Sequence, residues 1–114
     1  MDRVVEATES SVGGSPIGVY GLNDPTPFVV NDGFCEHMLS VCDVVRSVLV
    51  VRKTWSSAHL VGSYKLKHVA EKAIGSYVAN GEAILAVAIL GIPQRPMPSS
   101  PNSLIRATYT DTGR

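Results

Sequence analysis

Residues 62–91, GSYKLKHVAEKAIGSYVANGEAILAVAILG, contain the strongest pattern in this chain of 114 residues. They predict two helices joined by a tight turn at Asn80-Gly81. The second helix, 83–90, has no polar face, and a helix that is apolar all round is buried all round. Gly91 and Pro93 then end it, because glycine suits the position after a helix and proline cannot continue one. We therefore expect a central apolar helix around which the rest of the chain is arranged.

The first helix of this pair is predicted over 64–78, with Ser63 at its start and a narrow apolar stripe. Gly75 inside it costs about 1 kcal/mol relative to alanine, so either another segment packs closely on it or the helix breaks there. Upstream, apolar residues recur every three or four positions and predict an amphipathic helix over 33–50, capped by Asn31 or Asp32. Its last turn is rich in β-branched residues and could instead begin a strand.

The β component is expected to be minor. Residues 103–110 alternate between two sets of side chains, which predicts a strand that pairs with 17–20 or 28–30. The sequence thus indicates a small α+β protein of about three helices. Its expected organisation is a flexible arm over 1–16, one globular domain over 17–110 and a frayed tail over 111–114.

Charge is balanced overall but unevenly distributed. The net charge is zero, which is unusual for a dedicated nucleic-acid-binding protein. Residues 1–40 carry six carboxylates against Arg3, whereas 41–114 carry nine Lys or Arg against four carboxylates. This division predicts either a basic face for an acidic partner or an acidic N-terminal part that packs near the basic part.

The sequence gives little support for a membrane segment, a disulfide or a metal site. No signal peptide or membrane-spanning stretch is visible, and Cys35 and Cys42 are too far apart on one helix for a disulfide, so we expect a cytoplasmic protein with reduced thiols. Cys35 and His37 would point about 200° apart on a helix, so they do not make a zinc site. No nucleophile motif or phosphate-binding glycine loop is present, and we expect no catalytic residue, metal or cofactor.

Three binding roles stay open. A helix, a turn and a helix with Lys65, Lys67 and Lys72 is typical of a helix-turn-helix, but 83–90 offers no polar side chains for base edges. If the break falls at Gly75-Ser76, the second helix would begin near Tyr77 and this objection would weaken. A protein-binding role is favoured by aromatic and arginine side chains, which often anchor interfaces. A homo-oligomer that buries the apolar helix is the third possibility.

The run from Ser63 to Gly91 resembles a group of short, uncharacterised proteins of plasmids and other mobile elements. The shared pattern is SYxLKHxxExxxGxYVxNG followed by a closing glycine, with a Pro-Asn pair before a strand. The resemblance implies a genomic setting rather than a mechanism, and it gives functional interest to His68 and the Tyr77–Asn80 turn.

These patterns lead to one expectation about function. The protein should be non-enzymatic and act by stoichiometric binding of another macromolecule, most concretely as an inhibitor of a host defence complex such as an anti-CRISPR protein. A DNA-binding regulator is the alternative. The candidate partner-binding residues are Arg52, Trp55, Tyr64, Lys65, Lys67, His68, Lys72, Tyr77 and Asn80.

Overall fold

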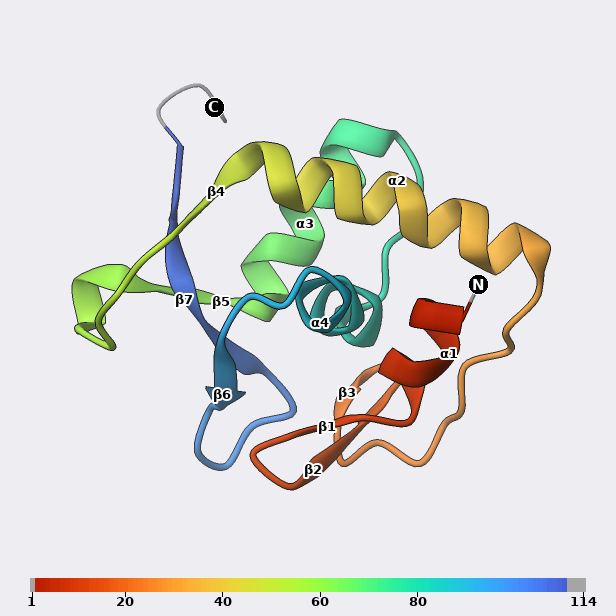
Figure 1. The fold of residues 1–114 in the computed structure, drawn as a ribbon, viewed down its shortest axis with the longest axis horizontal. Coiled ribbons are helices and arrows are strands. Elements are labelled where there is room, and N and C mark those ends of the chain that lie inside the picture. Colours follow the sequence, from red (N-terminus) through yellow and green to blue (C-terminus); the bar gives the residue numbers. More distant parts are fainter. Residues whose placement is uncertain (1, 111–114) are drawn as a thin grey trace.

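Helix α4 (Asn80–Ile89) lies at the centre of the fold and contacts α1, α2, α3 and strands β2 and β3 (Figure 1). This computed structural model describes residues 2–110. The segment from Ala83 to Val87 is completely buried, which confirms the central apolar helix. Because α4 is covered by other elements of the same chain, it is not available as a subunit interface.

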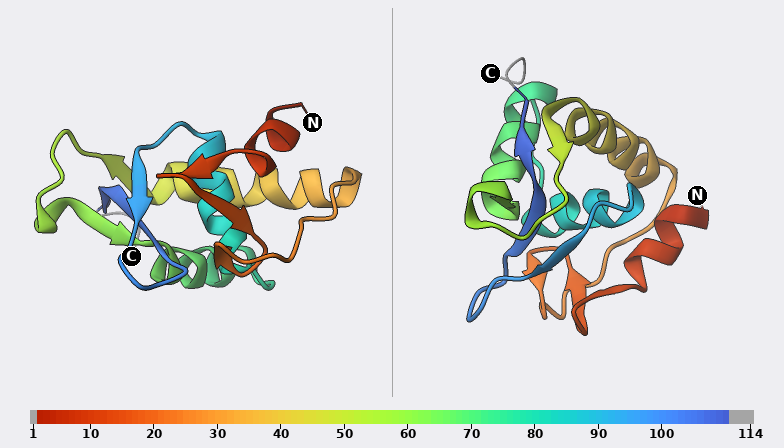
Figure 2. Two further views of the ribbon diagram at one scale, coloured as in Figure 1. Left: turned by 90° about the horizontal axis from the view of Figure 1, so that it is seen from below. Right: turned by 60° about the vertical axis from the view of Figure 1, so that its left-hand side comes forward.

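Residues 2–110 form an α+β fold with four α-helices and two small antiparallel sheets, which confirms the predicted fold class. Figure 2 shows α4 between α2 and the β1–β3 sheet. In chain order the elements are α1 (Asp2–Thr8), β1 (Ser11–Val12), β2 (Ser15–Gly18), β3 (Gly21–Leu22), α2 (Asp32–Val48), β4 (Leu49–Val51), a 3-10 turn (Ser57–His59), β5 (Leu60–Gly62), α3 (Ser63–Ile74), α4, β6 (Gln94–Pro96) and β7 (Ser103–Tyr109).

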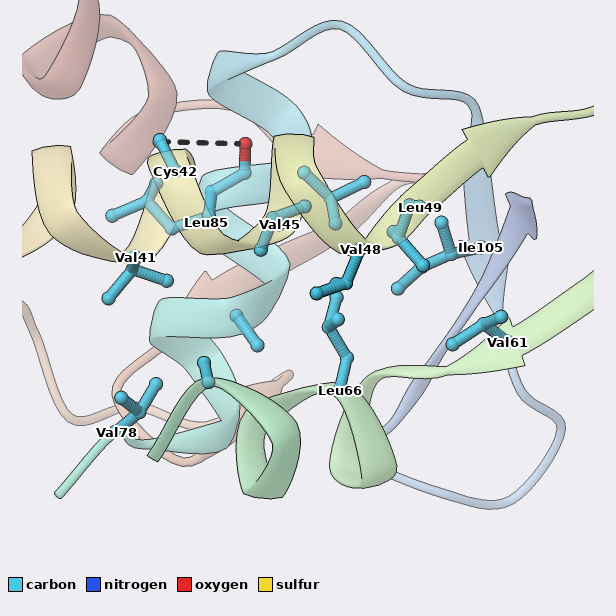
Figure 3. Packing of buried hydrophobic residues seen from close by; sticks show 14 of the residues in the cluster. Val41, Cys42, Val45, Val48, Leu49, Val61, Leu66, Val78, Leu85 and Ile105 are labelled. Atoms are coloured by element: carbon cyan, nitrogen blue, oxygen red, sulfur yellow. Dashed lines mark hydrogen bonds between the residues drawn. The ribbon is translucent and has the colours of Figure 1, made fainter. Parts of the chain in front are cut away.

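Helix α2 follows its sequence pattern closely. The Asn31 side chain accepts a hydrogen bond from the Phe34 N–H, as expected of an N-cap. The valines of its inner face pack against Leu66 of α3 and Leu85 of α4 (Figure 3). The helix ends at Val48 and β4 begins at the next residue, so the strand alternative for the last turn is the correct one.

The turn between α3 and α4 lies earlier than predicted. Helix α3 ends at Ile74 because Gly75 adopts a left-handed φ of 83°, a conformation that glycine takes without strain. The chain is not helical again until Asn80, where the Glu82 carboxylate accepts a hydrogen bond from the Ala79 N–H at 2.9 Å. The predicted turn at Asn80-Gly81 is therefore wrong, since both residues belong to the first turn of α4.

Strand β7 organises the larger sheet, but with other partners than predicted. It pairs with β4 through Ala107–Tyr109 and with β6 through Ser103–Ile105, both along one edge, and with β5 along the other. The predicted pairing with 17–20 or 28–30 is wrong, because β2 is paired with β1 and β3 and residues 28–30 do not form a strand. The residues that β4, β5 and β6 contribute are only three each, too few to show an alternating pattern.

The N-terminal segment is folded, in contrast to the flexible arm expected over 1–16. Residues 2–16 form α1, β1 and the start of β2, and α1 packs against α4. Val4, Ala7 and Val12 are buried, and this apolar burial holds the segment in place. The expected tail over 111–114 lies outside the described residues.

Gly81 allows the β2–β3 hairpin to sit directly on α4. Its N–H donates to the Val19 carbonyl at 2.9 Å, and a Cβ at this position would overlap the Gly18 carbonyl oxygen. No other residue type permits this approach of two backbones. The contact fixes the loop that carries Tyr20.

Both thiols are free, as predicted. Burial raises the pKa of the Cys42 thiol, which lies 4.0 Å from the Ala86 carbonyl oxygen (Figure 3), whereas Cys35 is half-buried. Within residues 2–110, none of the helices has the length and apolar character needed to cross a bilayer.

Candidate functional site

A pocket of about 470 Å³ forms where α3, the 75–79 turn, the β2–β3 loop and the start of β7 meet. Three of the four tyrosines line it, and each is more than half exposed: Tyr20 at 58%, Tyr64 at 54% and Tyr77 at 62%. We call this feature the tyrosine pocket. Its lining residues are Tyr20, Tyr64, Lys67, Tyr77, Asn80, Pro101 and Asn102.

Lys67 supplies the positive charge in this pocket. The residue is only 7% exposed, yet its Nζ lies 4.8 Å from the Tyr77 ring centroid and 5.5 Å from that of Tyr64. An ammonium over aromatic faces is attracted by their negative quadrupoles. Lys67 therefore holds two tyrosines from different segments around one cation.

Glu71 fixes the position of this lysine and of the turn. Its Oε1 lies 3.2 Å from Lys67 Nζ and 3.0 Å from His68 Nδ1, while Oε2 accepts from the Val78 N–H at 3.2 Å. Burial raises the pKa of Glu71, but the Val78 hydrogen bond and the Lys67 ammonium outweigh it, so the net pKa is below its usual value. The carboxylate thus remains charged at neutral pH and joins α3 to the extended 76–79 segment.

His68 completes the rim. Its ring packs edge-on against Tyr64 with centroids 4.7 Å apart. The contact restricts the Tyr64 ring while leaving it exposed, since an edge-to-face pair is a favourable aromatic geometry.

Asn80 forms the base of the pocket and ties four segments together. Its Nδ2 donates to the Tyr20 carbonyl at 3.3 Å and to Asn102 Oδ1 at 3.0 Å, and its Oδ1 accepts from Ser63 Oγ at 2.9 Å. Ser63 Oγ in turn accepts from the Ser103 N–H. Because buried amides need such partners, Asn80 acts mainly as an organiser of the site and not as a contact residue.

The sequence-predicted site residues fall into separate places. Four of them line the tyrosine pocket: Tyr64, Lys67, Tyr77 and Asn80. His68 adjoins the pocket through its contact with Tyr64. Arg52 and Trp55 lie instead at the larger sheet, where Arg52 donates to Thr108. Lys65 is exposed beside Tyr109, and Lys72 is exposed on α3.

Sequence reasoning missed Tyr20 and gave no role to Pro101 and Asn102 beyond the resemblance. Tyr20 lies 44 residues before Tyr64 and 57 before Tyr77, and long-range contacts of the β2–β3 hairpin with Gly81 and Asn80 bring it there. A contact between distant segments leaves no pattern in the local sequence. The Pro-Asn pair before β7, noted as part of the resemblance, is the one sequence feature that points to this side of the pocket.

The predicted helix-turn-helix does not have an exposed second helix. Helix α4 is buried from Ala83 to Val87, so it has no side chains to offer to a DNA groove. Its N-terminus is covered as well, because Asn80 and Gly81 are buried beneath the β2–β3 hairpin.

Each histidine contacts a polar side chain, locally for His59 and His68 and across α2 and α4 for His37. His37 Nε2 lies 3.0 Å from Glu82 Oε1, His59 Nδ1 lies 2.7 Å from Thr54 Oγ1, and His68 contacts Glu71. Across residues 2–110, no cluster of three or more His, Cys, Asp or Glu side chains could hold a metal ion.

Comparisons with protein-family models, with curated proteins and with solved structures give no match to this chain.

Proposed function

We propose that this protein is non-enzymatic and acts by stoichiometric binding of a partner protein at the tyrosine pocket. The observation that carries the proposal is the gathering of Tyr20, Tyr64 and Tyr77, from three separate segments, around one hollow. Tyrosines are enriched among the residues that dominate interface energies, because each combines a large apolar ring with a polar tip.

The pocket is held in shape before any partner arrives. Lys67, Glu71 and Asn80 fix its walls through charged and amide hydrogen bonds. A site that is already ordered loses less side-chain entropy on association. The polar groups within it, an ammonium and two amides, suit a partner segment that inserts an apolar or aromatic group beside an acceptor oxygen.

A host defence complex is the partner class we would test first. The reason is the resemblance of 63–91 to proteins of mobile elements, which gain from inhibiting such complexes. An anti-CRISPR role is the most concrete form of this proposal. A DNA-binding regulator is the weaker alternative, because the buried α4 leaves the helix-turn-helix without a recognition surface.

The first test is phage plaque formation on bacteria that carry an active CRISPR–Cas system and express this protein. We expect expression to restore plaquing and the Tyr64→Ala/Tyr77→Ala variant to lose that effect. With the purified defence complex, loss of the two rings should weaken binding at least about thirtyfold, as for central interface residues.

Leu39→Ala is the matched control. Leu39 is 65% exposed on α2 and lies outside the tyrosine pocket, so its removal tests whether any exposed apolar side chain matters. Equal activity of the double-tyrosine variant and wild type would refute the role of the pocket. Absence of inhibition across a panel of defence systems would refute the anti-defence form of the proposal.

A further inference from the structure

A second surface lies on the larger sheet, on the face turned away from the core. Ile105 and Ala107 of β7 are buried in the core, so Leu104, Arg106 and Thr108 point to the opposite face. Figure 1 shows α2, α3 and α4 to one side of β7 and the β4–β5 connection on the other. We call this outward side the arginine face.

The strand register places three arginines on this face. Val51 pairs with Ala107, so Arg52 lies opposite Arg106, and Arg95 pairs with Leu104. Directly opposed residues in an antiparallel pair project to the same side. Like charges that face each other across two strands are destabilising, so the fold alone gives no reason for this arrangement.

Trp55, the only tryptophan of the chain, lies among these cations. Its ring centroid is 4.6 Å from Arg95 Cζ and 5.5 Å from Arg106 Cζ, and the residue is half-buried. Arg52 Nε donates to Thr108 Oγ1 at 2.8 Å, which directs its guanidinium along the same face. The buried Arg106 Nε has no hydrogen-bond partner within residues 2–110.

Among the residues that the structure describes, no carboxylate forms an ion pair with these arginines. The sequence contains no Asp or Glu in 44–70 or in 83–110, the stretches that supply all four strands of the sheet. Among the described residues, the ion pairs involve Arg46, Lys67 and two histidines, and none of the cations of this face. The described carboxylates of the acidic N-terminal part therefore make no ion pair with the arginine face, and the sheet carries positive charge although the net charge of the chain is zero.

We infer that the arginine face binds single-stranded nucleic acid. Arginine guanidiniums pair with phosphates, and an aromatic ring between them offers a surface on which an unpaired base can stack. Duplex DNA keeps its bases stacked inside the helix and could use only the phosphate contacts. This surface is separate in its residues from the tyrosine pocket.

Binding can be measured on the intact protein with a fluorescently labelled oligothymidylate of about 15 nucleotides. We expect quenching of the Trp55 emission on binding. The logarithm of the binding constant should fall with the logarithm of salt concentration with a slope of about −2, as expected for three phosphate contacts to a single strand.

Two variants locate the site. Arg52→Gln/Arg95→Gln changes two exposed side chains, and it should weaken binding at least about tenfold and flatten the salt slope. Trp55→Ala should also weaken binding about tenfold, measured by anisotropy of the labelled strand. Thermal unfolding confirms that each variant is folded. Lys72→Gln, at an exposed lysine of α3, is the single-charge control and should bind like wild type.

Three results would overturn the inference. The first is absence of binding at low salt up to about 100 μM protein. The second is unchanged binding of the oligonucleotide by Arg52→Gln/Arg95→Gln. The third is equal affinity for polyglutamate without Trp55 quenching, which would indicate an acidic protein partner. Tyr64→Ala/Tyr77→Ala should bind the oligonucleotide within twofold of wild type, so this inference and the proposed function can fail independently.

Discussion

At the scale of single residues, some buried polar groups of this protein have hydrogen-bond or ion-pair partners, whereas others have none within residues 2–110. Lys67 is almost buried, but Glu71 and two aromatic rings compensate its charge. The Tyr109 hydroxyl is also buried and has no hydrogen-bond partner within residues 2–110. A buried polar group without a partner costs free energy, whereas a paired one is close to neutral or stabilising.

Tyr109 should therefore make the protein sensitive to alkali. Burial raises its pKa to about 12, above an unfolded value near 10. Between these pH values the unfolded chain releases the proton and the folded protein retains it, so stability is present below pH 10 and falls as the pH rises. After a discount for partial solvent exposure, we expect a loss of about 1–2 kcal/mol by pH 12.

The measurement compares urea unfolding of wild type and Tyr109→Phe from pH 8 to pH 12. Tyr109→Phe should lack the part of the alkaline loss of stability that comes from Tyr109. At pH 8 its free energy of unfolding should equal that of wild type or exceed it by up to about 1 kcal/mol. Tyr64→Phe, at an exposed tyrosine, should keep the wild-type profile. Parallel profiles for wild type and Tyr109→Phe would contradict the assignment.

The two cysteines should differ in reactivity. Only the thiolate is nucleophilic, and burial both raises the pKa of Cys42 and blocks access to it. Iodoacetamide at pH 8 should modify the native protein once, at Cys35, and a second time only after unfolding. Mass spectrometry of the intact chain measures this, and Cys35→Ser should remove the fast reaction. Equal rates at both thiols would show that Cys42 is accessible.

At the scale of elements, the predictable parts were those with long, regular patterns. Helix α2 extends over enough residues for its apolar periodicity to be visible, and α4 is recognisable as an uninterrupted apolar run between helix-ending residues. The three-residue strands β4, β5 and β6 carry no periodicity, and they pair with residues of β7 that lie up to 60 positions away, as Leu49 does with Tyr109. The break at Gly75 was one of two stated alternatives, because a glycine within a helix pattern fits both a close contact and a cap.

The residues of the tyrosine pocket likewise differ in how far the local sequence predicts them. Tyr64, Lys67, Tyr77 and Asn80 belong to one continuous run and were identifiable together. Tyr20 was not, since its place depends on the contact between the β2–β3 hairpin and α4 at Gly81. Arg52 and Trp55 belong to the same set of predicted partner-binding residues, but strand pairing carries them to the sheet and away from the pocket.

The hairpin contact gives a prediction for Gly81→Ala. The added methyl would overlap the Gly18 carbonyl and stand 2.6 Å from the Val19 carbonyl oxygen, so the hairpin must move away from α4. We expect a loss of about 3 kcal/mol or more in urea unfolding, typical of overpacking between backbones. Partner binding at the tyrosine pocket should weaken too, because Tyr20 moves with the hairpin.

Gly33→Ala is the matched control, because Gly33 lies in the first turn of α2 with only an ordinary 3.5 Å contact to Asn31. Its effect should be below about 1 kcal/mol, or slightly stabilising through helix propensity. Similar losses in Gly81→Ala and Gly33→Ala would show that the hairpin contact is not specific.

At the scale of the whole molecule, one chain of buried and partly buried hydrogen bonds connects the separate layers. It runs from the Ile84 carbonyl through Gln94, Ser103 and Ser63 to Asn80, and so links α4, β6, β7 and α3. Every step joins residues at least nine positions apart in the chain. Such a network strengthens cooperativity, because loss of one member leaves the others unpaired.

The N-terminal segment should unfold together with this network and not as a separate arm. Helix α1 packs on α4, with Val4 and Ala7 buried and Arg3 donating to the Ile89 carbonyl at 3.2 Å. Val4→Asp places a carboxylate in this contact, and we expect it to lower the stability of the entire domain by about 2 kcal/mol or more. Glu6→Gln, at an exposed position of the same helix, should leave stability unchanged.

Urea unfolding followed by Trp55 fluorescence is decisive, because that reporter lies on the sheet and has no part in α1. A midpoint that moves for Val4→Asp shows one cooperative unit, whereas an unchanged midpoint would mean that residues 2–16 detach without affecting the core.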